Sequence, residues 1–264
     1  MNVTLKTAPP AGIDAAEWKI RCDLAALYRL VAHFRMTDFI YTHISARLPG
    51  PDHHFLINDY GVMFHEMRAS DLVKIDLDGN RVETPGQTGK RVNQAGFTIH
   101  SAIHMARPDL MCVVHTHTAA GIAVAAQEHG LLPISQHALK FYGCLSYHGY
   151  EGIALDLDER ARIVADLGQN KAMILRNHGL LVGGGSIAEA FLEIYFLERA
   201  CQAQVAAMSG GAKLVVPPPE VCEHTAAQYR MDAPNRAGHA EMAWQSALRL
   251  VDDGASLAIG EYWT

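Results

Sequence analysis

The sequence predicts an α/β fold in layers, built around one mixed sheet. Two observations support this fold class. Short apolar runs of strand length alternate with segments of helical periodicity, and other strand-like runs are separated by turn-rich segments. Alternation favours parallel strands joined by helices, whereas hairpins favour antiparallel pairs. With 264 residues, of which 49% are hydrophobic, the chain can bury a sizeable core in one domain.

The N-terminal part is predicted to contain a tail, a helix and short strands. Residues 1–12 are expected to be flexible, because Pro9, Pro10 and Gly12 discourage regular structure. Asp14 is a candidate N-cap for a helix that runs to about Phe34. The predicted strands are 41–48, 55–58 and 72–77, and the turn 78–80 leads from the last of them into 81–83.

Helices and buried strands alternate from there to residue 210. The predicted helices cover 96–106, 118–128 and 158–167, and the predicted strands cover 111–114 and 172–175. A long helix follows Gly185, where Ser186 and Glu189 have the spacing of a capping box. The expected division is a tail (1–12), one domain (13–210), and a linker with a helical tail packed on that domain (211–264).

Composition narrows the expected partners and location. The formal net charge of −6 gives no basic footprint for nucleic acid. No stretch approaches the roughly 18 apolar residues that span a bilayer, and the first residues lack a secretory pattern. The five cysteines are odd in number and contain no CxxC, which favours a reducing compartment. We therefore expect a cytoplasmic protein without a nucleic-acid or membrane partner.

Two histidines follow the apolar strand 111–114, in the stretch VVHTHT. Residues i and i+2 of a strand share a face, so His115 and His117 are expected to point the same way. Such a pair alone is also typical of two hydrogen-bonded histidines at a strand end. However, His178 follows the second buried strand in the same manner, and Gly179 allows backbone or substrate to come close. Three neutral imidazoles with open coordination positions suit one catalytic divalent ion: zinc first, with manganese, iron and cobalt as alternatives.

Several longer segments resemble the class II aldolase/adducin family. They are YTHISARLPG, NDYGVMFHEMRASDLVKIDLDG, NQAGFTIHSAIHMARPDLMCVVHTHTAAGIAV and RNHGLLVGGGSIAEAF. The resemblance covers about residues 20–210 and is closest to the adducin-like branch. It implies a three-layer α/β/α domain, a homotetramer with active sites near subunit boundaries, and a small-molecule substrate. It also implies that His115, His117 and His178 are the metal ligands.

The chain departs from the sugar-phosphate aldolases that it resembles. Gly96 stands where they carry an acid–base glutamate, and Gln94 and Ala95 stand where they carry a serine pair that helps to hold phosphate. His43 replaces the asparagine of their phosphate loop. We therefore expect a substrate without phosphate. His43, Gly61 and Gly96 are assigned to substrate binding, with Gly96 leaving space beside the metal.

Other residues are candidates for replacing the lost acid. The segment 136–152 is rich in proton-carrying groups, and His148 is the first candidate for acid–base work because imidazole titrates near neutral pH. Tyr147 is the second candidate. Arg47 and Arg176 could clamp a substrate carboxylate in a bidentate manner. The alternative for each is structural: packing for the tyrosine, and an ion pair for the arginines.

The favoured function is a divalent-metal-dependent lyase, a decarboxylase or aldolase acting on a hydroxy or keto acid or an aromatic carboxylate. Decarboxylation removes no hydroxyl proton, so it needs less from the missing glutamate, and the metal can stabilise the charge left behind. One alternative is a mononuclear iron oxygenase on the same scaffold. Another is a non-enzymatic assembly module like the adducin heads, and an isomerase or epimerase is a further possibility. Metal analysis distinguishes the first three.

Overall fold

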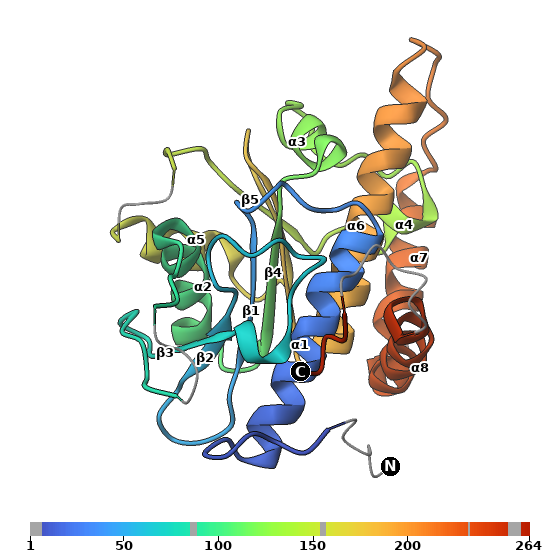
Figure 1. Ribbon diagram of the computed structural model, residues 1–264. Helices are drawn as coiled ribbons and strands as arrows, with labels where there is room; N and C mark the ends of the chain where they lie inside the picture. Colours follow the sequence, from blue (N-terminus) through green and yellow to red (C-terminus); the bar gives the residue numbers. More distant parts are fainter. Residues whose placement is uncertain (1–6, 85–88, 154–156, 232, 253–259) are drawn as a thin grey trace.

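A single mixed sheet forms the centre of the molecule (Figure 1). The computed structural model describes residues 7–84, 89–153, 157–231, 233–252 and 260–264. In these residues seven strands follow the order β3-β2-β1-β4-β7-β6-β5. The strands are β1 (His43–Arg47), β2 (Phe55–Ile57), β3 (Val73–Ile75), β4 (Cys112–Thr116), β5 (Leu145–His148), β6 (Ala172–Leu175) and β7 (Gly179–Gly184). Only β5 and β6 pair in parallel, so the predicted mixed sheet is confirmed.

Helices cover both faces of this sheet, which confirms the three-layer α/β/α architecture (Figure 1). Helices α1, α3 and α6 pack on one face, and α2 and α5 pack on the other. Helix α8 packs on α1 and α6, outside the first layer. The helices are α1 (Ala15–His33), η1 (Ala69–Asp71), α2 (Gln94–Ala106), α3 (Ala119–Ala125), α4 (Gln136–Leu139), α5 (Glu159–Leu167), α6 (Ile187–Met208), α7 (Pro219–Met231) and α8 (Ala233–Asp252).

Strand β4 shows how the alternation of side chains builds two cores. Cys112 and Val114 join the core cluster that contains residues of α1 and α6, whereas Val113 joins the cluster that contains residues of α2 and α5. Side chains of a strand alternate between faces, so His115 shares the face of Val113. The apolar run therefore places one imidazole on the α2 side of the sheet, at the end of a strand buried on both faces.

The two predicted helix starts are confirmed by their caps. The Asp14 carboxylate accepts a hydrogen bond from the backbone N–H of Glu17 at 2.8 Å. The Ser186 hydroxyl accepts one from Glu189 N–H at 3.1 Å, and the Glu189 carboxylate accepts one from Gly185 N–H at 2.7 Å. These bonds satisfy backbone donors that the first turn of a helix leaves without partners.

Four elements were not predicted: β5, β7, the short α4 and the single turn η1. Strand β7 has the sequence GLLVGG, and its glycines hide a strand that is buried along its whole length. It forms a tight hairpin with β6, in which Leu175 pairs with Gly179. Conversely, the predicted strand 81–83 is reduced to one isolated bridge between Ile75 and Arg81.

The N-terminal segment is held more firmly than predicted. Residues 1–6 of the expected tail lie outside the described residues. The Thr7 hydroxyl donates to the Trp263 carbonyl at 2.9 Å and accepts from the Trp18 ring N–H at 3.3 Å. The part of the tail that is described is thus tied to α1 and to the C-terminal residues. The division at residue 210 stays a prediction; residues 211–218 have no regular structure, and α7 and α8 follow them.

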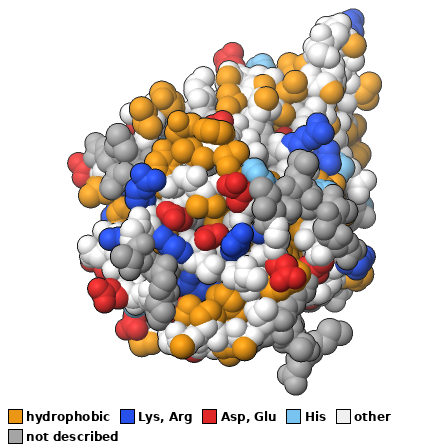
Figure 2. All heavy atoms as spheres, viewed as in Figure 1, with side chains coloured by type: hydrophobic (Ala, Val, Ile, Leu, Met, Phe, Trp, Pro, Cys, Tyr) orange, Lys and Arg blue, Asp and Glu red, His pale blue; other side chains and the backbone are white. Residues whose placement is uncertain are grey.

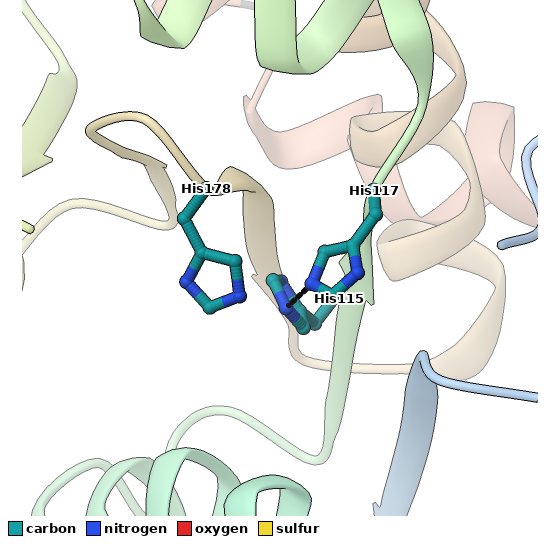
Figure 3. Close-up of side chains that lie close together, drawn as sticks. All are labelled: His115, His117 and His178. Atoms are coloured by element: carbon teal, nitrogen blue, oxygen red, sulfur yellow. Dashed lines mark hydrogen bonds between the residues drawn. The ribbon is translucent and has the colours of Figure 1, made fainter. Parts of the chain in front are cut away.

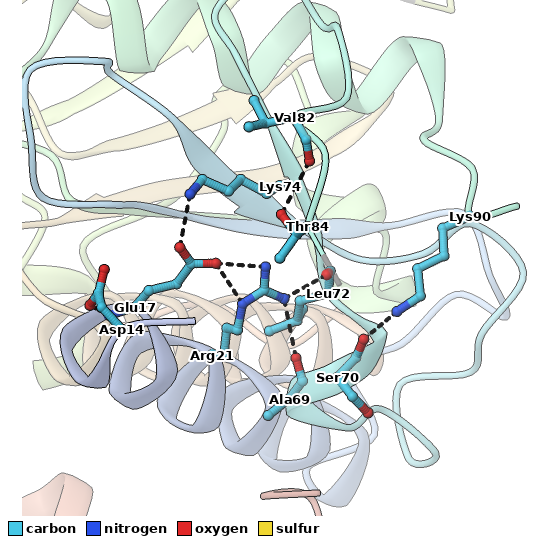
Figure 4. Close-up of polar contacts among 10 residues, drawn as sticks. All are labelled: Asp14, Glu17, Arg21, Ala69, Ser70, Leu72, Lys74, Val82, Thr84 and Lys90. Carbon is cyan, nitrogen blue, oxygen red and sulfur yellow. Dashed lines mark hydrogen bonds and ion pairs between the residues drawn. The ribbon is translucent and has the colours of Figure 1, made fainter. Parts of the chain in front are cut away.

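A buried ion-pair network ties α1 to the β3 edge of the sheet (Figure 4). The Glu17 carboxylate binds Arg21 at 2.8 Å and Lys74 at 2.9 Å. Arg21 also donates to the Leu72 carbonyl at 2.8 Å. Because Arg21 is 1% exposed, these partners satisfy a charge that would otherwise be costly to bury.

The surface agrees with the modest charge of the sequence. On the face shown in Figure 2, cationic and anionic side chains are interspersed, without a large area of one sign. No helix in the described part of the chain is both long enough and apolar enough to cross a membrane.

Candidate metal centre

Three imidazoles meet at one edge of the sheet (Figure 3). His115 lies in β4, His117 directly follows β4, and His178 lies in the turn between β6 and β7. One ring nitrogen of each lies within 4.8 Å of the other two. The ring centroids are 4.6–4.8 Å apart. We refer to these residues as the histidine triad.

Sheet topology brings the triad together. Strands β4 and β6 both pair antiparallel with β7, so they run in the same direction and end at the same edge. The turn after β6 can approach β4 because residue 179 is glycine: a Cβ there would lie 2.3 Å from the Thr116 carbonyl oxygen. The close approach anticipated at Gly179 is therefore an approach of backbone to backbone.

Hydrogen bonds determine which nitrogen of the His115 ring and of the His117 ring carries the proton. His115 Nδ1 lies 2.9 Å from the Leu180 carbonyl, and His117 Nδ1 lies 3.1 Å from the Asp38 carboxylate. A carbonyl and a carboxylate only accept, so both Nδ1 atoms donate, and a neutral imidazole then has no proton on Nε2. Yet the two Nε2 atoms are 2.8 Å apart. Two lone pairs thus face each other, and a cation between them removes that conflict.

The electrostatics of the triad also favour a bound metal cation. Burial, followed by the neighbouring imidazoles, holds the pKa of His115 well below its ordinary value. Burial and the nearby His117 and His148 lower the pKa of His178 to about 4. Metal ligation needs the neutral ring. Two nitrogens that bind one tetrahedral zinc ion at about 2.0–2.1 Å lie about 3.4 Å apart, so the widest pair needs to close by ~1.4 Å and the Nε2 pair of His115 and His117 needs to open by ~0.6 Å.

A cavity of about 440 Å³ opens beside the triad. Its walls combine aromatic and aliphatic side chains with a few polar ones. Apart from the triad, the lining residues are Asp38, Tyr41, His43, Tyr60, Asn93, Ile99 and Ile153. Among the described residues that line it there is no lysine or arginine. The site therefore offers room for a small molecule but no cation, other than a bound metal, for a phosphate.

The structure corrects the interpretation of Gly96. A Cβ at this position would lie 2.5 Å from Cδ2 and 2.9 Å from Nε2 of His43. The His43 ring thus fills the space beside Gly96, and that space is not open to substrate. The two departures from the sugar-phosphate aldolase pattern, His43 and Gly96, are thus in direct contact with each other. His43 itself does line the cavity.

Behind His43 lies a polar network that the sequence interpretation missed. His43 Nδ1 is 2.9 Å from His100 Nε2, and His100 Nδ1 is 2.5 Å from the Ser45 hydroxyl. The same hydroxyl is 2.7 Å from His104 Nε2. All four side chains are at most 2% exposed. We call this series, from His43 to His104, the buried chain.

A sequence signal for the buried chain existed. In β1, HISAR places His43 and Ser45 on the same face, because side chains of a strand repeat every two residues. In α2, HSAIH places His100 and His104 on the same face, because helical neighbours are four residues apart. Both patterns were visible, but only the tertiary structure shows that the two faces meet.

Neither predicted arginine clamp is available for substrate. Arg47 lies at the other end of β1 from His43, about 13 Å away at 3.3 Å per residue, and its guanidinium donates to the His104 carbonyl. Arg176 donates to the Gln127 carbonyl at 2.7 Å, and its guanidinium stacks 4.3 Å from the centre of the Tyr147 ring. Arg47 is far from the triad, and Arg176 is held by backbone.

The two predicted proton donors also have protein partners, although His148 lines a small second cavity with His178. His148 Nδ1 lies 2.7 Å from the Asp166 carboxylate, and its Nε2 lies 3.3 Å from that of Glu159. The Tyr147 hydroxyl accepts the Leu131 N–H at 3.0 Å. Neither residue lines the 440 Å³ cavity. This geometry favours structural roles for both and does not support the predicted acid–base roles.

Gly61 lies next to the cavity but is exposed and is not in contact with the triad. Its φ of +112° is a conformation that favours glycine. The adjacent Tyr60 lines the cavity and donates its backbone N–H to the Arg91 carbonyl at 2.9 Å. Gly61 therefore shapes the loop that presents Tyr60, and its predicted role in substrate binding stays a prediction.

Known proteins have a similar sequence and a similar fold. The pattern of the family described as Class II Aldolase and Adducin N-terminal domain matches residues 22–205. A Caulobacter vibrioides protein, assigned to aldolase class 2 by name only, is 52% identical over 241 residues, which are 91% of each chain. Rat (Rattus norvegicus) alpha-adducin is 48% identical over 202 residues, which cover 76% of this chain but 27% of adducin. The structure of L-fuculose 1-phosphate aldolase from Glaciozyma antarctica PI12 is 28% identical with a TM-score of 0.79, over 97% of this chain and 98% of that one.

Proposed function

Because the chain belongs to the class II aldolase and adducin family, we propose that it is a divalent-metal-dependent lyase that cleaves a carbon–carbon bond of a non-phosphorylated hydroxy or keto acid or aromatic carboxylate. The reaction is a decarboxylation or an aldol cleavage. The metal is zinc, with manganese, iron and cobalt as alternatives, and one ion is bound per subunit by His115, His117 and His178.

One observation carries the proposal: the Nε2 atoms of His115 and His117 face each other at 2.8 Å while both Nδ1 atoms point to acceptors. A purely structural pair of neutral histidines would place a hydrogen between them. Two converging lone pairs with a third imidazole at hand, beside a cavity, are the arrangement of a catalytic metal site with open positions.

A divalent ion at this site supplies Lewis acidity toward a substrate oxygen. The protein side chains then have defined tasks. Leu180 and Asp38 orient the His115 and His117 rings by accepting their Nδ1–H groups. Tyr41, Ile99 and Ile153 form the apolar part of the cavity wall, which suits a compact or aromatic substrate body.

The cavity supports a substrate without phosphate. Sugar phosphates need a cation or a set of N–H donors away from the metal. The described lining residues include Asp38 but no lysine or arginine, and His43 occupies the position of the expected phosphate-loop asparagine. We expect ketose 1-phosphates to be poor substrates, and efficient turnover of L-fuculose 1-phosphate would contradict this.

Assembly is part of the proposal. Several apolar side chains near the cavity are exposed in the single chain, among them Phe39 at 63% and Ile153 at 74%. Exposed apolar residues at the rim of a site are typical of a subunit interface. We expect a homotetramer with the site near a subunit boundary. Light scattering that gives the monomer mass of 28.8 kDa at micromolar concentration would contradict it.

A second candidate function is a non-enzymatic assembly module, which the 48% identity to alpha-adducin favours. Metal analysis of freshly purified protein, combined with a panel of hydroxy acids, keto acids and aromatic carboxylates, tests both. Bound zinc together with release of CO2 or an aldehyde supports the lyase. Iron with substrate-dependent oxygen uptake supports the alternative of an oxygenase. Protein that binds no divalent metal at all supports the assembly module.

A further inference from the structure

A small second cavity of about 10 Å³ lies beside His178, which lines both this cavity and the 440 Å³ one. Figure 3 shows one nitrogen of the His178 ring turned toward His115 and the other turned away from the triad. His115 and His117 each direct their outer nitrogen, Nδ1, to a protein acceptor. No hydrogen bond joins the His178 ring to any residue that the structure describes. The outer nitrogen of His178 therefore still needs an acceptor.

The wall of the small cavity holds a buried carboxylate, that of Glu159. Strands β5 and β6 run parallel, so their ends bring His148 and His178 to the same edge of the sheet. His148 pairs with Leu175, which packs in the core cluster that contains residues of α5, and Glu159 is the first residue of α5. Glu159 is 6% exposed, and its Oε1 lies 3.3 Å from His148 Nε2. Its second oxygen, Oε2, makes no hydrogen bond with a described residue.

The other polar side chains of the small cavity are engaged elsewhere or exposed. Arg162 donates to both oxygens of Glu151 at 2.9 Å. Arg176 donates to the Gln127 carbonyl at 2.7 Å. Tyr150 is 57% exposed. Among the described lining residues, the Glu159 carboxylate is thus the buried acceptor that remains for His178.

The size and polarity of the small cavity suit one water molecule. A buried water needs roughly 10–15 Å³ and two to four polar partners. The cavity has about the lower of these volumes, and both His178 and the Glu159 carboxylate line it. A histidine that binds a metal almost always donates its other ring N–H to a carboxylate, a carbonyl or a water, and this bond fixes the orientation of the ring.

We propose that one water molecule in the small cavity links the outer nitrogen of His178 to the Glu159 carboxylate and thereby orients the third metal ligand. The water accepts the His178 N–H and donates to Glu159 Oε2. Glu159 and His148 are positioning residues: Glu159 anchors the water, and the His148 ring holds Glu159. The inference rests on the proposed function for its metal, whereas the water link itself depends on the protein alone.

A high-resolution crystal structure of the full chain tests the link without any assay, both as purified and after treatment with a chelator. We expect one ordered water within hydrogen-bond distance, about 2.7–3.2 Å, of both the outer His178 nitrogen and a Glu159 oxygen. A direct bond between His178 and Glu159, or a cavity without ordered water, overturns the proposal. If the protein binds no metal, the proposed function fails while this structure still decides the link.

Zinc affinity tests the purpose of the link, and competition with a chromogenic chelator measures it. Glu159→Met has a side chain of similar length without a carboxylate, so zinc should bind about 10-fold more weakly, the lower end of the effect of an outer-shell partner. Glu159→Gln loses the charge but keeps an acceptor for the water, and it should restore most of the affinity. If Glu159→Met does not fold, Glu159→Ala takes its place with the same expectation.

The matched control is Glu151→Ala, which removes a carboxylate from the same cavity, but one that Arg162 already binds. It should keep the wild-type zinc affinity. Two outcomes overturn the proposal while wild-type zinc binding, and with it the proposed function, stands. One is an unchanged affinity in the Glu159 variant that lacks an acceptor. The other is an equal loss in Glu159→Gln, which would assign the effect to charge and not to the link.

Discussion

Two neighbouring groups of three histidines, the triad and the histidines of the buried chain, differ in how their nitrogens are satisfied. His43 and His115 are even register partners in β1 and β4. Within the buried chain every link joins one donor to one acceptor. Within the triad two acceptors face each other. The comparison teaches that a histidine cluster is identified as a binding site by its unsatisfied lone pairs, and not by the number of its imidazoles or by their burial.

The strongest test of this difference removes a triad member. His117→Ala should abolish stoichiometric metal binding, with a loss of affinity greater than the 10–100-fold that an outer-shell partner contributes. The fold should persist, because His117 lies after β4 and outside the three core clusters. Elemental analysis and circular dichroism measure the two effects. His224→Ala on the exposed face of α7 is the control, and full metal retention by His117→Ala would contradict the site.

The next test removes the support of a triad ring. Asp38→Asn keeps the shape of the side chain but weakens the acceptor of the His117 Nδ1–H. Metal affinity should fall by about 10–100-fold. Competition with a chromogenic chelator measures it. Asp52→Asn, in an exposed turn, is the control and should leave affinity unchanged.

Acid should destabilise the folded protein through the histidines of the buried chain. Burial holds the pKa of His43 and His100 well below the ordinary value and that of His104 at about 3. Such a histidine stays neutral in the folded protein but takes up a proton near pH 6.5 in the unfolded chain. The free energy of unfolding is therefore highest above pH 6.5 and falls as the pH drops toward 3. At pH 5 the loss is about 2 kcal/mol for His104, at 1.36 kcal/mol per unit.

Urea unfolding of the metal-free protein at pH 7 and pH 5 measures this loss. His104→Leu should be less stable at pH 7, because Ser45 loses a partner, but should show a shallower decline between the two values. An equal decline in the variant and the wild type would mean that the buried chain is not responsible.

The boundary between the two groups is tested at Gly96. In Gly96→Ala the new methyl group would meet the His43 ring at 2.5 Å. We expect a destabilisation of about 1–3 kcal/mol, although alanine is intrinsically the better helix former by about 1 kcal/mol. Thermal unfolding measures it. Gly149→Ala, where no atom lies within 4 Å of the new Cβ, is the control. A more stable Gly96→Ala would show that His43 moves freely.

The smallest effect is expected outside both groups. Tyr147→Phe removes the acceptor of the Leu131 N–H and should cost about 1 kcal/mol of stability without changing metal content. Chemical unfolding and elemental analysis measure these, with the exposed Tyr150→Phe as control. A sharp loss of turnover at unchanged stability would instead restore the predicted role of Tyr147 as a proton donor.

Local patterns were sufficient for much of the fold and for the composition of the triad. The caps at Asp14 and Ser186 and the alternation of β4 depend on near neighbours in the chain, so the sequence determines them directly. The repeated arrangement of a buried strand followed by histidine identified all three triad residues. Strand β7 was missed because glycines are unusual inside a strand. The structure shows that close packing requires one of them: a Cβ at Gly184 would lie 2.4 Å from the Ala190 backbone nitrogen.

Only the tertiary structure decided what the remaining candidates do. Arg47 and His43 belong to the same strand, but strand length places them at opposite ends, and just one of them reaches the cavity. Gly96 seemed to leave space until β1 and α2 were brought together and His43 filled it. His100 and His104 had no visible role until Ser45 faced them across the same contact. A hydrogen bond or a filled space needs side chains from two elements. The local sequence determines which side chains share a face of each element, but only long-range packing brings the two faces together.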